Sequence, residues 1–242
     1  MSYIRSVKLE KLTKESGYAA KLPAVKSLAE MGELVLQNSV TFLVGENGTG
    51  KSTLLEAIAV KYGFNAEGGS LNFSFSTKET HSPLHSAIKL VRGIERPKTG
   101  FFLRAESFYN AASYVDTLGH EILEAYGGTS LHEQSHGESF FSLVMNRFTG
   151  HGLYILDEPE AALSPSRQMS LLIRIKELTE QGSQFIIATH SPIILAFPDS
   201  VIYELTENGI AETAYEDTET YGVMKAFMDS PKRMIDHLFE KE

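Results

Sequence analysis

Residues 45–52 read Gly45-Glu46-Asn47-Gly48-Thr49-Gly50-Lys51-Ser52, a complete match to the phosphate-binding pattern G-x-x-x-x-G-K-[ST]. An apolar run that suits a buried strand (40–44) precedes this loop, and residues 53–59 suit a helix. In that order the glycines let successive backbone N–H groups converge on phosphates at the positive end of a helix dipole. A glycine-rich turn that merely opens a helix is the alternative, and eight matched positions between a buried strand and a helix argue against it. The stretch predicts a nucleoside triphosphate site.

Each part of the loop has an expected role. Lys51 is expected to reach the β- and γ-phosphates, and the Ser52 hydroxyl to ligate Mg²⁺. The other residues expected to line the nucleotide site are Gly45, Glu46, Asn47, Gly48, Thr49, Gly50 and Thr53.

The composition is that of an ordinary globular protein of 242 residues, with 42% apolar and 22% charged residues. We expect residues 1–242 to form one domain with a helical subdomain at about 105–150. A net charge of −9 argues against a generally basic nucleic-acid-binding surface, and the absence of cysteine excludes disulfides and thiolate-metal sites. No secretory signal and no apolar run near the ~20 residues that span a bilayer is present, so we expect a cytoplasmic protein without direct membrane insertion.

Two stretches flanking the loop are open to more than one interpretation. Residues 3–10 alternate as a strand and a second extended piece is expected at about 18–28, which makes Tyr3 and Tyr18 candidates for stacking on adenine; packing is favoured for both.

Residues 88–104 hold five cations against one acid, a local charge of +4. We favour a solvated helix face and a turn there, and a phosphate or nucleic-acid contact is the alternative. The five cations are Lys89, Arg92, Arg96, Lys98 and Arg104.

Helices and strands alternate in the second half of the chain. Helical spacing covers 106–126, and another helix is expected to start after Ser135. The remaining expected elements are apolar strands at 153–156 and 184–188, helices at 166–181 and 191–198, a hairpin around 207–209, and helices near 220–228 and 231–239. This alternation predicts an α/β fold with a mostly parallel sheet flanked by helices.

Three polar groups follow expected core strands closely. Asp157 and Glu158 come directly after residues 153–156, and His190 follows residues 184–188. Because ligands of open α/β sheets bind at the carboxyl ends of the strands, we expect these residues to meet Ser52 around one γ-phosphate. Asp157 would hold Mg²⁺, Glu158 would orient and activate the attacking water, and His190 would contact the γ-phosphate. Taken alone, Asp157 and Glu158 could instead be acids at an ordinary strand end, and His190 could be a histidine of the core.

In this order the motifs resemble those of an ABC-type ATPase, with Walker A at 45–52, Walker B at 153–157, Glu158 as catalytic glutamate and His190 as switch histidine. Residues 134–138, Gln-Ser-His-Gly-Glu, are similar to the family's L-S-G-G-Q signature, with Ser135 and Gly137 in place and His136 where the first glycine stands. Ser135 and Glu138 also fit a helix-capping box, and both roles are compatible.

The resemblance implies a P-loop NTPase fold with an N-terminal antiparallel β layer and a short helical insert, and ATP and Mg²⁺ as ligands. It also implies that Ser135, Gly137 and Glu138 of one copy contact the nucleotide held by Lys51 of another, in a head-to-tail homodimer that ATP closes. The segment Ala162-Leu163-Ser164 stands at the family's D-loop, with Ser164 in place of the usual aspartate. An unidentified partner protein is expected as well.

Two outputs stay open. Residues 157–165 resemble the compact soluble SMC-like and DNA-repair-like ATPases, whose output here could be nucleic-acid maintenance or defence. The alternative is the ATP-binding subunit of a membrane transporter. Such subunits carry a glutamine, in a segment called the Q-loop, that couples the site to the membrane partner. No glutamine occurs between Ser52 and Gln134, and Glu106 is the nearest polar substitute. The interval from Lys51 to Asp157 is too short for a coiled-coil arm. A sensor that binds ATP without hydrolysing it is a third reading, against which Glu158 argues.

Overall fold

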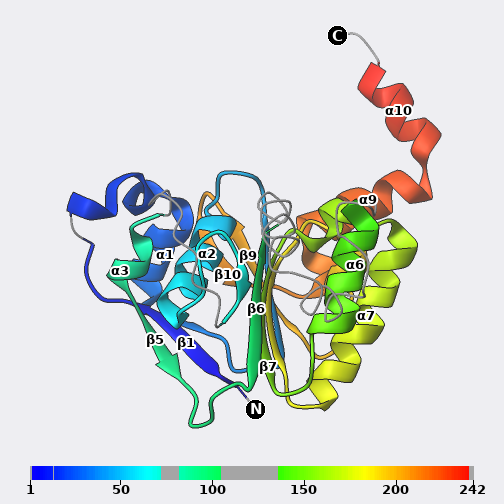
Figure 1. The fold of residues 1–242 in the computed structure, drawn as a ribbon. Helices are drawn as coiled ribbons and strands as arrows, with labels where there is room; N and C mark the ends of the chain where they lie inside the picture. The colour runs from blue at the N-terminus through cyan, green and yellow to red at the C-terminus, as the bar shows by residue number, and fades with distance from the viewer. Residues whose placement is uncertain (1, 13, 72–81, 105–135, 240–242) are drawn as a thin grey trace.

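The computed structural model describes residues 2–12, 14–71, 82–104 and 136–239. Two sheets form its framework, with helices packed on both faces of the larger one (Figure 1). No described helix is long and apolar enough to cross a membrane.

The smaller sheet is antiparallel and lies at the N-terminal side. Its strands are β1 (Ile4–Leu9), β2 (Glu33–Val35) and β5 (Ile88–Arg92), in the order β2-β1-β5. The expected N-terminal antiparallel layer is therefore confirmed. Gln184 ties this sheet to the larger one, because its buried amide accepts from the backbone N–H groups of Tyr3 and Ile4 and donates to the carbonyls of Ile4 and Leu36.

The larger sheet has the strand order β10-β9-β3-β8-β7-β6-β4. The five strands from β9 to β6 run parallel, and β10 and β4 pair antiparallel at the two edges. The bounds are β3 (Val40–Gly45), β4 (Gly69–Ser70), β6 (Thr99–Arg104), β7 (Gly152–Asp157), β8 (Gln184–Ala188), β9 (Val201–Thr206) and β10 (Gly209–Glu212). Strands β3, β7 and β8 are buried along their whole length, as central parallel strands covered on both faces must be.

Helices cover the two faces of this sheet, as Figure 1 shows. One face carries α1 (Pro23–Met31) and α2 (Lys51–Tyr62), and the other carries α6 (His136–Arg147) and α7 (Pro165–Glu180). Shorter elements are η1 (Lys14–Lys21), α3 (Leu84–Ala87), η2 (Pro159–Ala162), α8 (Pro192–Leu195) and η3 (Tyr215–Asp217). At the C-terminus α9 (Glu219–Asp229) leads to α10 (Pro231–Phe239), which projects away from the body.

Two of the sequence predictions are wrong. The extended piece at 18–28 is the end of η1 and most of α1, because Pro23 opens a helix that buries one face through Ala24, Val25 and Leu28. The helix face at 88–104 is instead β5, a turn and β6, because the apolar residues there pair with strands on either side. The helix at 106–126 lies outside the described residues. The elements expected at 153–156, 166–181, 184–188, 207–209, 220–228 and 231–239 are confirmed to within a few residues.

Candidate functional site

The phosphate loop has a backbone that only glycine adopts without strain. Gly45, Gly48 and Gly50 have φ angles of 138°, 87° and 103°. At Gly45 a Cβ would also lie 2.0 Å from the backbone oxygen of Leu205, so no side chain fits there. Thr49 closes the loop by donating its hydroxyl to the carbonyl of Glu46 at 2.9 Å. The loop tip at Glu46, Asn47 and Gly48 is exposed, which leaves it open to a ligand.

Lys51 is buried inside this loop. Its Nζ donates to the carbonyl oxygens of Gly45 at 2.5 Å and Glu46 at 2.8 Å. Burial lowers the pKa of Lys51 below its usual value, while the carboxylates of Glu158 and Asp157 act in the opposite direction. The ammonium group is thus a costly buried charge held by neutral carbonyls, and a polyanion would be a better partner for it.

Ser52 and Asp157 meet at the carboxyl edge of the sheet. The Ser52 hydroxyl donates to Asp157 Oδ1 at 2.9 Å, which joins the first turn of α2 to the end of β7. A hydroxyl and a carboxylate oxygen are ligands that Mg²⁺ accepts, and Mg²⁺ commonly takes only one or two protein carboxylates together with substrate phosphates. Within the described ranges no group of three or more His, Cys, Asp or Glu side chains is arranged to hold a metal ion. The pair therefore fits the predicted Mg²⁺ role.

Glu158 and His190 face each other across the sheet edge. Strand β8 lies between β3 and β7, so the residue after β8 falls beside both the phosphate loop and Glu158. His190 Nε2 lies 3.7 Å from Glu158 Oε1. That nitrogen is buried and has no hydrogen-bond partner among the described residues. His190 is therefore not a core histidine whose two ring nitrogens are both hydrogen-bonded. Its Nε2 remains able to bind a ligand.

Arg104 belongs to this edge too, which sequence reasoning missed. It ends β6 opposite Asp157, and its guanidinium lies 2.5 Å from Glu56 Oε2 and 3.8 Å from Asp157 Oδ2. Glu56 is a buried residue of α2, and its other oxygen accepts from the backbone N–H of Ser82. Arg104 therefore bridges the helix that carries Ser52 and the strand that carries Asp157. The sequence signal that could have placed Arg104 at the site is its position directly after the apolar residues Phe101-Phe102-Leu103.

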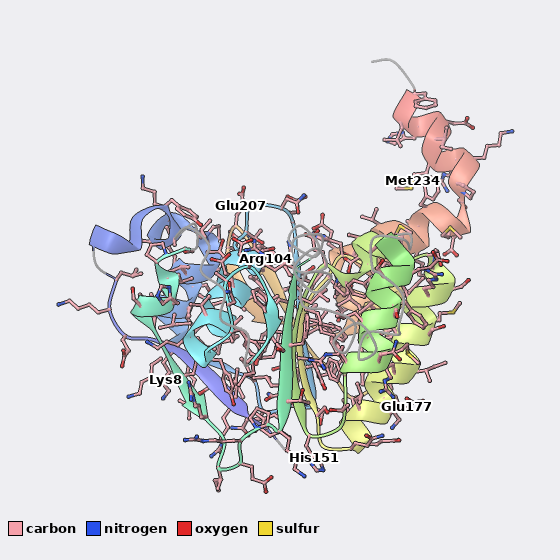
Figure 2. The ribbon with its side chains drawn as sticks, viewed as in Figure 1. Lys8, Arg104, His151, Glu177, Glu207 and Met234 are labelled. Carbon is pink, nitrogen blue, oxygen red and sulfur yellow. The ribbon has the colours of Figure 1, made fainter. Side chains whose placement is uncertain are left out.

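The rest of the basic stretch does not form one surface with Arg104. Figure 2 shows Arg104 toward the upper end of the sheet, whereas His151, which pairs through its carbonyl with the Lys98 N–H at 2.9 Å, lies at the lower end. Lys89 pairs with Glu10 at 3.9 Å, and Arg92 lies over the ring of Tyr62 at 4.7 Å. Nucleic-acid binding through residues 89–104 stays a prediction.

The two adenine-stacking candidates differ in burial. Tyr3 is 1% exposed and donates its hydroxyl to the carbonyl of Gly182, so it is a packed core residue. Tyr18 is 60% exposed on η1 rather than on a strand. The packing interpretation favoured from the sequence holds for Tyr3.

The signature-like segment is described from α6 onward, and Ser135 lies outside the described residues. Gly137 packs so closely on η2 that a Cβ there would lie 2.5 Å from the carbonyl oxygen of Ala162. Glu138 pairs with Arg167 of α7 at 3.6 Å. The start of α6 is thereby fixed against the segment that follows Glu158.

Comparisons with known proteins agree with this arrangement. Residues 81–196, slightly less than half of the chain, match a family described as "AAA domain, putative AbiEii toxin, Type IV TA system". The ribose import ATP-binding protein RbsA of Lacticaseibacillus paracasei is 27% identical over 255 residues, which cover 96% of this chain and 48% of that protein. This chain thus spans about half the length of that relative.

Solved structures match over most of the chain. A metal-chelate type ABC transporter in an inward-facing conformation matches with a TM-score of 0.50 and 16% identity, over 95% of this chain and 90% of that one. The SMC head domain from Thermotoga maritima matches with a TM-score of 0.45 and 14% identity, over 87% and 98%. The expected α/β P-loop fold of ABC ATPase type, with its mostly parallel sheet and antiparallel N-terminal layer, is confirmed.

Proposed function

From the fold of an ABC-type P-loop ATPase, we propose that this chain is an ATP-binding and ATP-hydrolysing switch that closes as a head-to-tail dimer. One observation carries the proposal. Five polar side chains from three separate segments converge at the carboxyl edge of the sheet, where such folds bind their ligands. They are Lys51, Ser52, Asp157, Glu158 and His190.

Binding would use the loop and the start of α2. The backbone N–H groups after Gly45 and the helix dipole attract phosphate, and Lys51 exchanges the two loop carbonyls for phosphate oxygens. This exchange pairs the buried ammonium with an opposite charge, which favours the bound state. Ser52 and Asp157 would hold Mg²⁺, which supplies charge neutralisation of the β- and γ-phosphates.

Hydrolysis would depend on Glu158 and His190. The Glu158 side chain is 41% exposed, so its carboxylate is accessible to a water molecule, which it can orient and deprotonate. His190 Nε2, buried and without a hydrogen-bond partner among the described residues, can bind a γ-phosphate oxygen as that oxygen gains charge. Arg104 lies near Asp157 Oδ2, whereas Ser52 donates to Oδ1, so the two residues would orient Asp157 together.

Closure would come from a second copy. Ser135, which directly precedes α6 in the sequence, would act together with Gly137 and Glu138 to present a helix N-terminus to the γ-phosphate held by Lys51 of the other chain. Only a triphosphate reaches across such an interface, so ATP favours the closed dimer and hydrolysis reopens it. Such a dimer has an open and a closed state, and an unidentified partner protein could bind one of them in preference to the other.

Replacing Ser135 with arginine tests the signature role. We expect the variant to bind ATP as a monomer with unchanged affinity, because the loop of its own chain is intact, while turnover falls at least about tenfold because the long cation blocks closure. Titration calorimetry and a steady-state phosphate-release assay measure the two effects. Lys176→Ala, which removes only an exposed pair to Glu180 on α7, is the control and should keep turnover within about twofold. Wild-type turnover in Ser135→Arg would leave only the capping role.

A transporter subunit is the second candidate. It is favoured by the name of the curated relative, a ribose import ATP-binding protein. Affinity purification from membranes and from the soluble fraction separates the two candidates: copurification with an integral membrane protein supports the transporter, and turnover stimulated by DNA or RNA supports a role in nucleic-acid maintenance or defence.

A further inference from the structure

A second carboxylate next to the catalytic glutamate holds the segment that carries His190. Glu160 lies in η2, and both of its oxygens accept hydrogen bonds from the residues after β8. The Thr189 hydroxyl donates to Oε2 at 2.7 Å, and the backbone N–H of His190 donates to Oε1 at 2.5 Å. Hydrogen bonds to an ionised carboxylate are stronger than those between neutral groups. The backbone position of His190 therefore depends on Glu160.

Neutral groups fix the same segment from its other side. The Ser191 backbone N–H donates to the Thr189 hydroxyl at 3.0 Å, and the Ser191 hydroxyl donates to Oε1 of Gln168 at 2.5 Å. All three of these residues are buried. With the backbone held on both sides, the imidazole of His190 is directed at the site, where its Nε2 lies 3.7 Å from Glu158 Oε1.

Glu160 also belongs to the segment on which α6 packs. Two residues further, the carbonyl of Ala162 is the atom that leaves room only for glycine at position 137. Thus η2 touches the first turn of α6 at one end and the backbone of His190 at the other. A displacement of α6, which the proposed dimer would bring against a second copy, would therefore be passed to His190 through Glu160.

We propose that Glu160 is a positioning residue for His190, and that through it Glu160 sets the preference of the site for ATP over ADP. This inference rests on the proposed function and deepens it. ATP and ADP share the phosphates that the loop and Lys51 bind, and they differ in the γ-phosphate that His190 would contact. A glutamate that only stabilised the loop would change the affinities for both nucleotides alike.

The test is a double-mutant cycle in which the affinities for a triphosphate and for a diphosphate are both measured. Binding of AMP-PNP and of ADP, each with Mg²⁺, is measured by titration calorimetry for the wild type, Glu160→Ala, His190→Ala and the double variant. We expect each single variant to bind AMP-PNP about tenfold more weakly with ADP affinity unchanged. The double variant should be no worse than His190→Ala alone, because both changes remove one contact. Glu180→Ala, which removes an exposed glutamate paired with Lys176, is the charge control and should match the wild type.

Three results would overturn the inference: a wild-type preference in Glu160→Ala, an equal loss for both nucleotides, or additive losses in the double variant. Failure of the proposed function looks different, because the wild type itself would then bind neither nucleotide. Should Glu160→Ala fold poorly, Glu160→Gln keeps the size and one acceptor oxygen, and a smaller loss confined to AMP-PNP is expected. A Glu160→Gln variant with no such loss counts against the inference.

Discussion

Lys51→Ala is expected to weaken ATP binding by at least about 100-fold, because the variant loses the charged hydrogen bonds that the buried ammonium would make to the β- and γ-phosphates. The fold should survive. Lys51 is a buried cation that, among the described residues, donates hydrogen bonds to two carbonyls of its own loop, and burial lowers its pKa. Its removal therefore relieves a desolvation cost in the nucleotide-free protein.

Calorimetric titration with Mg·ATP, next to a thermal melt, measures both effects. Lys61→Ala is the matched control, because Lys61 lies in the last turn of the same helix, far from the loop, and its loss should leave ATP affinity within about twofold. Near-normal affinity in Lys51→Ala would refute the assignment of residues 45–52 as the phosphate site.

Glu158→Gln is expected to reduce turnover by about 10²–10⁴-fold while ATP affinity stays near that of the wild type. The amide has the size of the carboxylate and can still bind a water molecule, but it cannot accept a proton. Glu158 has a φ of 51°, and glutamine meets the same backbone strain, so the comparison isolates the chemistry.

Phosphate release under saturating Mg·ATP gives the turnover, and Glu177→Gln is the control because Glu177 is an exposed residue that pairs with Arg174. Full turnover in Glu158→Gln would place the base elsewhere. A wild type that binds ATP without any turnover would instead favour the non-hydrolysing sensor.

The core of the fold and the cluster around the phosphate loop could be predicted because their signals are local. Residues 40–58 carry strand, loop and helix in one continuous pattern. Asp157 stands directly after one expected apolar strand, and His190 stands two residues after another. The rule that ligands gather at the carboxyl ends of parallel strands then brings distant residues together without any knowledge of the strand order.

What could not be predicted depends on pairings between distant segments. Residues 88–104 have no helix or strand period strong enough to decide between them, and only pairing with β1 and β7 makes them strands. Arg104 joins the site because it falls in register with Asp157. Glu160 was visible as an acid after Glu158, but its two hydrogen bonds reach a segment about thirty residues away.

The central claim is that ATP closes two copies of this chain around the nucleotide, and the solution mass of Glu158→Gln tests it most directly. Light scattering with and without Mg·ATP compares the monomer of 26.8 kDa with a dimer of twice that mass. We predict a shift from monomer to dimer when ATP is added, because the variant binds ATP and cannot reopen by hydrolysis. A mass that stays at the monomer value, with ATP shown to be bound, would contradict the account.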